Sequence, residues 1–134
     1  MTDSKKYKIL VVDDEDSQRN IYNEYLTMQG FHVLVAKDGQ EALDIVHANN
    51  DIDMVLLDLM MPKVDGIRVL EQLKTDSKTK HLIIYIMTVL GTDAMIKHAF
   101  DLGADGYLVK DSVEPDQIRD EIISAIAKRD GGHQ

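Results

Sequence analysis

The sequence predicts an α/β protein, built as an open, doubly wound parallel sheet with helices on both faces. Short apolar runs alternate with segments of helical period, and this alternation repeats five times along the 134 residues. Most of the apolar runs are continuous, which is typical of strands that are covered on both faces of a parallel sheet. Right-handed crossovers then allow either a closed barrel or a doubly wound sheet, and the chain is too short for the barrel.

Five strands are expected, one for each apolar run. The first run is YKILVV and the last is GYLVK. The five expected strands cover residues 7–12, 32–36, 53–58, 82–87 and 106–110.

A helix is expected after each strand, from apolar residues that recur at helical spacing. Gly30 and Gly103 are natural C-terminal residues for the first and fourth helices, and the asparagines at 49–50 end the second. The third helix begins at Gly66, and the fifth tolerates Pro115 in its first turn. The expected inner faces are, helix by helix, Ile21, Tyr25, Leu26 and Met28; Ala42, Leu43, Val46 and His47; Ile67, Leu70 and Leu73; Ala94, Met95, Ala99, Phe100 and Leu102; and Ile118, Ile122, Ile123, Ala125 and Ile126.

Length and composition narrow the possible classes of protein. The chain fits one domain over residues 1–134, with an ordered core at about 7–128 and termini that fray. It has no cysteine, no signal peptide and no membrane-spanning run, so we expect a cytoplasmic protein. A formal charge of −9 argues against direct binding of nucleic acid or insertion into a membrane, and favours a protein or a cation as partner.

Reactive side chains follow four of the five expected strands. In an open parallel sheet, ligands bind outside the carboxyl ends of the strands, so these side chains are expected to converge on one crevice. They are Asp13, Asp14 and Glu15 after the first strand, Asp58 after the third, Thr88 after the fourth and Lys110 after the fifth.

Clustered carboxylates at this crevice would require a cation. Two unit charges at about 4 Å and an effective dielectric of about 20 repel by about 4 kcal/mol. Oxygen ligands without histidine or cysteine favour a hard ion, and a few carboxylates with room for water suit Mg²⁺ better than Ca²⁺. We therefore expect Asp13, Asp14 and Asp58 to bind Mg²⁺.

The formal charges also suit a phosphoryl group. Asp13, Asp14 and Asp58 contribute −3, and Mg²⁺ with Lys110 contributes +3, so the resting site is balanced. A phosphoryl group on Asp58 leaves a net charge of about −1. Thr88 could donate a hydrogen bond to a phosphoryl oxygen, and the expected chemistry is attack by a carboxylate on phosphorus.

The chain resembles the receiver domains of two-component response regulators, of the single-domain, CheY-like kind. The motifs that carry the resemblance are ILVVDDE, LLDLMMPKVDG, IYIMT and GADGYLVK, which occur in order and together span most of the chain. The resemblance implies a flavodoxin-like (βα)5 fold with strand order 2-1-3-4-5. It also implies a phosphorylation-activated switch that receives its phosphoryl group from a sensor histidine kinase and catalyses no reaction on other substrates.

The resemblance also assigns roles to individual residues. Asp58 would be the phosphoacceptor and Lys110 would contact the phosphoryl group. Asp14 would bind Mg²⁺ directly, Asp13 would bind it through water, and the backbone carbonyl of Met60 would supply a further ligand. Thr88 and Tyr107 would bias a two-state surface on the fourth helix, fifth strand and fifth helix, where a downstream protein docks. The protein is expected to be a monomer or a weak dimer.

Two positions depart from the family pattern. Asp111 follows Lys110 where a proline, often in a cis peptide, is usual, so a cis bond is not expected. Val89 follows Thr88 where a small residue is common, and we predict that it shields the phosphoryl group and slows hydrolysis. An unchanged dephosphorylation rate in Val89→Ala would contradict this.

Other interpretations remain open at this point. Strand-end aspartates and Thr88 often cap helices or turns, and Tyr107 could be a packed aromatic residue. The chain could be a phosphorelay intermediate that passes its phosphoryl group to a histidine phosphotransfer protein, or a binding module that ignores phosphorylation. An aspartyl-phosphate hydrolase is a further class, but such enzymes usually carry an acid two residues after the nucleophile, where this chain has Met60.

Overall fold

The computed structural model describes residues 7–59, 66–88, 93–110 and 114–131, which form five strands and five helices in strict alternation. The strands are β1 (Lys8–Val12), β2 (His32–Ala36), β3 (Met54–Asp58), β4 (Ile83–Thr88) and β5 (Gly106–Val109). The helices are α1 (Asp16–Met28), α2 (Gly39–Ala48), α3 (Gly66–Thr75), α4 (Asp93–Asp101) and α5 (Pro115–Gly131).

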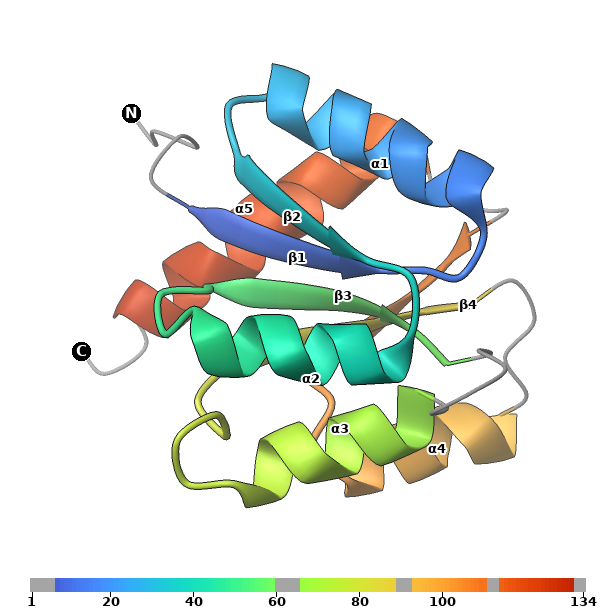
Figure 1. Cartoon of the computed structure of the whole chain (residues 1–134), viewed down its shortest axis with the longest axis vertical. Helices are drawn as coiled ribbons and strands as arrows, with labels where there is room; N and C mark the ends of the chain where they lie inside the picture. Colours follow the sequence, from blue (N-terminus) through green and yellow to red (C-terminus); the bar gives the residue numbers. More distant parts are fainter. Residues whose placement is uncertain (1–6, 60–65, 89–92, 111–113, 132–134) are drawn as a thin grey trace.

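All five strands are parallel, in the order β2-β1-β3-β4-β5. Helices α1 and α5 cover one face of the sheet, and α2, α3 and α4 cover the other (Figure 1). The expected doubly wound fold and its strand order are therefore confirmed. The order reverses between β1 and β3, and the side chains at the carboxyl ends of these two strands meet there.

The core has two layers because successive residues of a strand point to opposite faces of the sheet. Ile9 and Val11 of β1 pack beneath α1 and α5, whereas Leu10 and Val12 pack beneath α2 and α3. The central strand β3 is buried along its whole length, which explains why its sequence is a continuous apolar run that does not alternate.

Several expected inner-face residues are wrong. Helix α1 packs through Tyr22 and Leu26, whereas Ile21 and Met28 are exposed. The buried stripe is therefore rotated by about one residue from the predicted one, because α1 must contact both the sheet and α5. Three further residues that were expected to face inward are exposed: His47, Ala94 and Phe100.

The expected helix ends agree more closely with the structure. Gly30 and Gly103 both adopt positive φ, at 97° and 108°, just after α1 and α4. This left-handed conformation is the one that glycine reaches at low cost at a helix C-terminus. Helix α5 is longer than expected, because it continues to Gly131 through residues that were expected to fray. Among the described residues, no helix is both long and apolar enough to cross a membrane.

Candidate functional site

Asp58 is the last residue of β3 and lies at the carboxyl edge of the sheet. Its side chain points to the α1 and α5 face, because it has the same parity as Met54 and Leu56. Only 5% of the residue is exposed. A buried carboxylate at this position requires compensating interactions, because transfer of an isolated charge out of water is costly.

Gly66 fixes the backbone next to Asp58. A Cβ at this position would lie 2.4 Å from the carbonyl oxygen of Asp58 and 2.5 Å from Cα of Leu59. The amide of Gly66 also donates a hydrogen bond to the carbonyl of Leu59, at 3.2 Å. The first turn of α3 can therefore approach the end of β3 only because residue 66 has no side chain.

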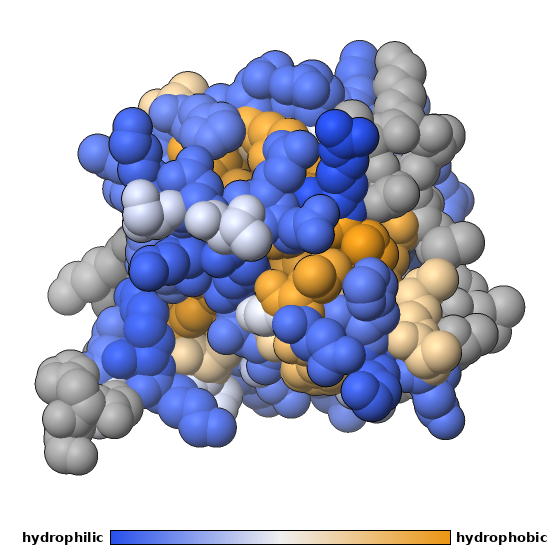
Figure 2. Space-filling view, turned by 90° about the horizontal axis from the view of Figure 1, so that it is seen from below, coloured by the Kyte–Doolittle hydropathy of each residue, from blue (hydrophilic) through white to orange (hydrophobic). Residues whose placement is uncertain are grey.

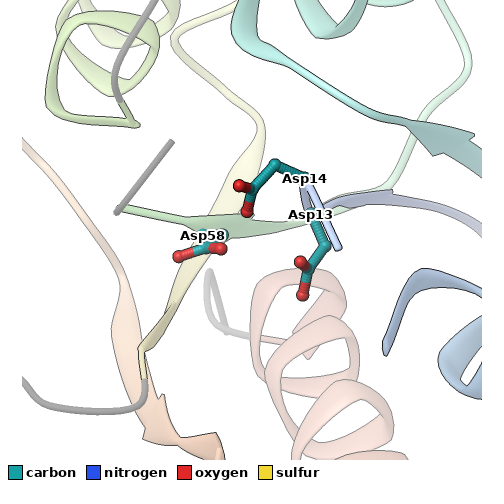
Figure 3. A group of neighbouring side chains, drawn as sticks. All are labelled: Asp13, Asp14 and Asp58. Carbon is teal, nitrogen blue, oxygen red and sulfur yellow. The ribbon is translucent and has the colours of Figure 1, made fainter. Parts of the chain in front are cut away.

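Asp13 and Asp14 follow β1 and bring two more carboxylates to Asp58. One carboxylate oxygen from each of the three residues lies within 4.8 Å of the others, and we call these three residues the acid cluster (Figure 3). Asp13 is buried, and its Oδ1 accepts a hydrogen bond from the amide of Glu15 at 2.9 Å. Asp14 is exposed, so the cluster is open to solvent on one side.

Among the described residues, Lys110 brings a positive charge into direct contact with the acid cluster. Its Nζ donates to Oδ2 of Asp13 at 2.6 Å and to Oδ2 of Asp58 at 3.3 Å. The lysine side chain is only 4% exposed. Burial works to lower the pKa of Lys110, but the hydrogen bond to Asp13 and the charge of Asp58 outweigh it and raise the pKa above its ordinary value of 10.5. Lys110 is therefore charged at neutral pH.

One lysine does not balance the cluster. Three carboxylates and Lys110 sum to a formal charge of −2 at neutral pH. The donors are all oxygen atoms, and one carboxylate is accessible to solvent. This donor set and charge fit a hard divalent cation such as Mg²⁺.

Thr88 is the last residue of β4 and is fully buried. It lies one residue beyond Met87, which pairs with Asp58 in the sheet. Among the described residues, its Oγ1 is the buried side-chain atom without a hydrogen-bond partner. A buried hydroxyl group that lacks a partner is costly, so this atom is available to a ligand that would reach it.

Tyr107 lies on the neighbouring edge strand and does not point into the site. It is 44% exposed, and its ring packs edge-to-face on Phe100 of α4, with ring centroids 6.1 Å apart. This pair places an aromatic surface across α4 and β5. Seen from below, hydrophobic residues show at several places between hydrophilic ones, and the broadest group lies right of centre (Figure 2).

The other sequence-predicted positions are less informative. Glu15 is exposed and acts as the N-terminal cap residue of α1, so it does not join the acid cluster. Met60, Val89 and Asp111 lie outside the described residues. The expected carbonyl ligand and the two departures from the family pattern therefore stay predictions.

Arg19 is a residue near the site that the sequence did not single out. Its Nη1 donates to the backbone carbonyl of Asp13 at 2.8 Å and so holds the turn between β1 and α1. No local pattern marks this arginine, since the contact depends on how the first turns of α1 fold back over the end of β1.

Comparisons with known proteins agree with this geometry. The sequence profile of the response regulator receiver domain family matches residues 9–123. The solved structure of the chemotaxis protein CheY4 of Vibrio cholerae superposes with a TM-score of 0.82 at 27% sequence identity, covering 88% of this chain and 97% of that one.

Two curated relatives are longer than this chain. The probable transcriptional regulator ycf27 of Guillardia theta is 44% identical over 105 residues, which cover 78% of this chain and 40% of the relative. The transcriptional regulatory protein CpxR of Escherichia coli K12 is 41% identical over 103 residues, which cover 77% of this chain and 42% of that protein. This chain therefore matches about two-fifths of each relative.

Proposed function

Because this chain belongs to the response regulator receiver domain family, we propose that it is a phosphorylation-activated switch with Asp58 as its phosphoacceptor. The observation that carries the proposal is the position of Asp58: a buried carboxylate at the end of β3, beside Lys110 and two further carboxylates. A carboxylate that served only to cap a turn would not need this arrangement around it.

The acid cluster would hold Mg²⁺ through Asp13, Asp14 and Asp58. When bound, this ion supplies positive charge that offsets the charge of the incoming phosphoryl oxygens. The fit rests on the all-oxygen donor set, the formal charge of −2 and the exposure of Asp14. The backbone carbonyl of Met60 remains a candidate ligand from the sequence.

The phosphoryl transfer would proceed by direct displacement. A carboxylate oxygen of Asp58 attacks the phosphorus atom of a phosphohistidine on a sensor kinase. A new P–O bond forms as the P–N bond breaks, and the electron pair stays on the histidine nitrogen, which then takes a proton. Lys110 already donates to Asp58, so its ammonium group could also donate a hydrogen bond to an oxygen of the phosphoryl group on Asp58.

The signal would leave the site through Thr88 and Tyr107. The Oγ1 of Thr88 lacks a partner among the described residues and would donate to a phosphoryl oxygen. Movement of Thr88 would open space on the α4 side of β4, into which the exposed ring of Tyr107 could turn. The surface of α4, β5 and α5 would then exist in two forms, one of which binds a downstream protein.

We propose that the residues of the site act only on Asp58 and on no external substrate. We also propose that the chain works in the cytoplasm, where sensor kinases present their phosphohistidine. The net charge of −9 supports the prediction that these residues do not bind nucleic acid themselves. The longer relatives are named as transcriptional regulators, so this prediction concerns these residues alone.

The test is the intact mass of the protein after incubation with a small phosphodonor such as acetyl phosphate, with Mg²⁺ or with EDTA. We expect one phosphoryl adduct on the wild type, only with Mg²⁺, and none on Asp58→Asn. Asp53→Asn, just before the opposite end of β3, is the matched control and should be phosphorylated like the wild type. An adduct on Asp58→Asn would overturn the assignment.

A further inference from the structure

The carboxylate of Asp14 is held in the acid cluster by its backbone and not by hydrogen bonds. Asp13 donates its amide to the carbonyl of Ala36 at 3.1 Å, and its two carboxylate oxygens accept from the amide of Glu15 and from Lys110. The carboxylate of Asp14 is exposed, and none of the described residues donates a hydrogen bond to it. Its position therefore depends on the direction in which the side chain leaves the turn after β1.

Arg19 holds the peptide group that joins Asp13 to Asp14. Its Nη1 donates to the carbonyl oxygen of Asp13 at 2.8 Å. This carbonyl lies in one peptide plane with the amide and the Cα of Asp14. A hydrogen bond that fixes the carbonyl oxygen therefore also limits the direction of the Asp14 side chain, which extends toward Asp58 (Figure 3).

The side chain of Arg19 is itself well anchored. Its backbone amide donates to the carbonyl of Glu15 at 2.9 Å, in the first turn of α1. The side chain is only 14% exposed, and its Nη2 forms an ion pair with Asp16, three residues earlier in the same helix. The planar guanidinium group thus contacts Asp13 and Asp16 at the same time. The ammonium group of a lysine, on its flexible stem, would not reproduce this geometry.

We propose that Arg19 is a positioning residue for the metal site, because its hydrogen bond to the carbonyl of Asp13 keeps the carboxylate of Asp14 in a position to bind Mg²⁺. The inference rests on the proposed function, in which the acid cluster holds this ion. Mg²⁺ requires nearly ideal octahedral geometry, so a small displacement of one ligand weakens binding. Residues that orient metal ligands typically contribute about 10- to 100-fold to metal affinity.

The positive charge of Arg19 would have the opposite effect on Mg²⁺ binding. A cation near the acid cluster repels a second cation, so removal of the charge alone should strengthen the binding of Mg²⁺. Loss of the hydrogen bond to Asp13 should weaken it. A role of Arg19 that is confined to the packing of α1 would change stability and leave the metal affinity as it is. The direction of the change in Mg²⁺ affinity therefore separates these roles.

Isothermal titration calorimetry with MgCl₂ alone measures this affinity on the full chain at neutral pH. We expect Arg19→Met to bind Mg²⁺ about tenfold more weakly than the wild type. Arg19→Lys keeps the charge and a donor group, and its affinity should lie between the two. Arg119→Met on α5 is the matched control, because the side chain of Arg119 contacts Asp116, Asp120 and Gln29, and its affinity should equal that of the wild type.

Phosphorylation by acetyl phosphate gives a second measurement. Arg19→Met should form the adduct more slowly than the wild type at low Mg²⁺ and at nearly the wild-type rate at saturating Mg²⁺, because the contacts of Lys110 with Asp58 do not involve Arg19. A rate that stays low at saturating Mg²⁺ would overturn the inference, since the effect of Arg19 would then lie outside metal binding.

The inference is also overturned if folded Arg19→Met binds Mg²⁺ as tightly as the wild type or more tightly. Circular dichroism checks folding. If Arg19→Met does not fold, Arg19→Lys decides, and an affinity equal to that of the wild type overturns the inference. Mg²⁺-dependent phosphorylation of the wild type with an unchanged affinity in Arg19→Met would overturn this inference alone. If the wild type binds no Mg²⁺, the proposed metal site fails and the role of Arg19 fails with it.

Discussion

Aspartates and lysines lie at both ends of the sheet, and the two ends differ in how far the aspartates are paired. At the amino ends of the strands, aspartates are matched by cations and amide groups. Asp53 accepts from the amide of Lys8 at 2.9 Å and from Arg129 at 3.1 Å. Asp105 accepts from the amide of Ile84 at 2.8 Å and from Lys74 at 3.0 Å.

At the carboxyl ends, the described residues bring one lysine to the three carboxylates of the acid cluster. Lys110 reaches Asp13 and Asp58, whereas Asp14 faces solvent. The buried hydroxyl of Thr88 adds a donor that no described residue uses. Within the described residues, the aspartates at the amino end are therefore matched, whereas the acid cluster with Lys110 keeps a formal charge of −2 and the hydroxyl of Thr88 has no partner. A group of strand-end carboxylates that keeps a net charge after its ion pairs are counted is therefore a stronger indication of function than an aspartate with a matched cation.

The largest expected difference between the two ends is in the stability that is lost when the lysine at each end is replaced. Lys110→Met removes the ammonium group that contacts the buried Asp13 and Asp58, and should lower the free energy of unfolding by about 3–5 kcal/mol in EDTA. Lys74→Met should cost only about 1–2 kcal/mol, because Asp105 is partly exposed and keeps the amide of Ile84. Urea denaturation measures both.

Added Mg²⁺ sharpens this comparison. It should recover part of the loss in Lys110→Met by supplying charge to the acid cluster, and should leave Lys74→Met unchanged. Equal losses for the two variants in EDTA, or an equal response to Mg²⁺, would mean that the two ends do not differ in the way described.

The next largest effect concerns the glycines at the two ends. Gly66→Ala places a Cβ against the backbone of Asp58 and Leu59, which cannot yield, and should cost about 3 kcal/mol. Gly106→Ala meets the ring of Tyr85, at 2.6 Å from the nearest atom, but this half-buried ring can turn outward. Gly106→Ala should lower the free energy of unfolding by about 1 kcal/mol, which urea denaturation again measures. A larger loss in Gly106→Ala would contradict the distinction.

Removal of one carboxylate should change the free energy of unfolding in opposite directions at the two ends of the sheet. Asp58→Asn relieves repulsion within the acid cluster and leaves the pair of Lys110 with Asp13, so it should raise the free energy of unfolding by about 1 kcal/mol in EDTA. Asp105→Asn weakens the contact with Lys74 and should lower it by about 1 kcal/mol. Thermal unfolding in EDTA would detect both changes, and a loss of stability in Asp58→Asn would refute the interpretation.

The smallest expected effect is a difference in how much stability the wild type and Lys110→Met lose at alkaline pH. The pKa of Lys110 is raised in the folded protein, so its charge stabilises the fold below the ordinary value of 10.5, and this contribution is lost as pH rises through the folded pKa. Burial also raises the pKa of Tyr25 and of Tyr85, which adds a loss that all variants share. The wild type should therefore lose more stability above pH 10.5 than Lys110→Met. Parallel curves for the two proteins would argue against a charged, paired Lys110.

The sequence by itself determined the fold class and the meeting of the acid cluster with Lys110. Continuous apolar runs require strands that are buried on both faces, and parallel strands bring their carboxyl ends to one edge. Asp13, Asp58 and Lys110 follow three such runs, so their convergence depends only on strand order and direction. The ends of α1 and α4 were equally predictable, because Gly30 and Gly103 occupy a conformation that few other residues adopt.

Only the tertiary structure decided which side chains pair and which helix faces are buried. Ile21 fits the helical period as well as Tyr22 does, and packing against the sheet and α5 selected Tyr22. The closer contact of Lys110 with Asp13 than with Asp58, and the lack of a partner for Thr88 among the described residues, likewise depend on distances across several strands. The local sequence pattern indicates which face of a helix or strand a residue can occupy. Which side chains pair is decided by contacts between segments far apart in the chain, and no short stretch of sequence contains these contacts.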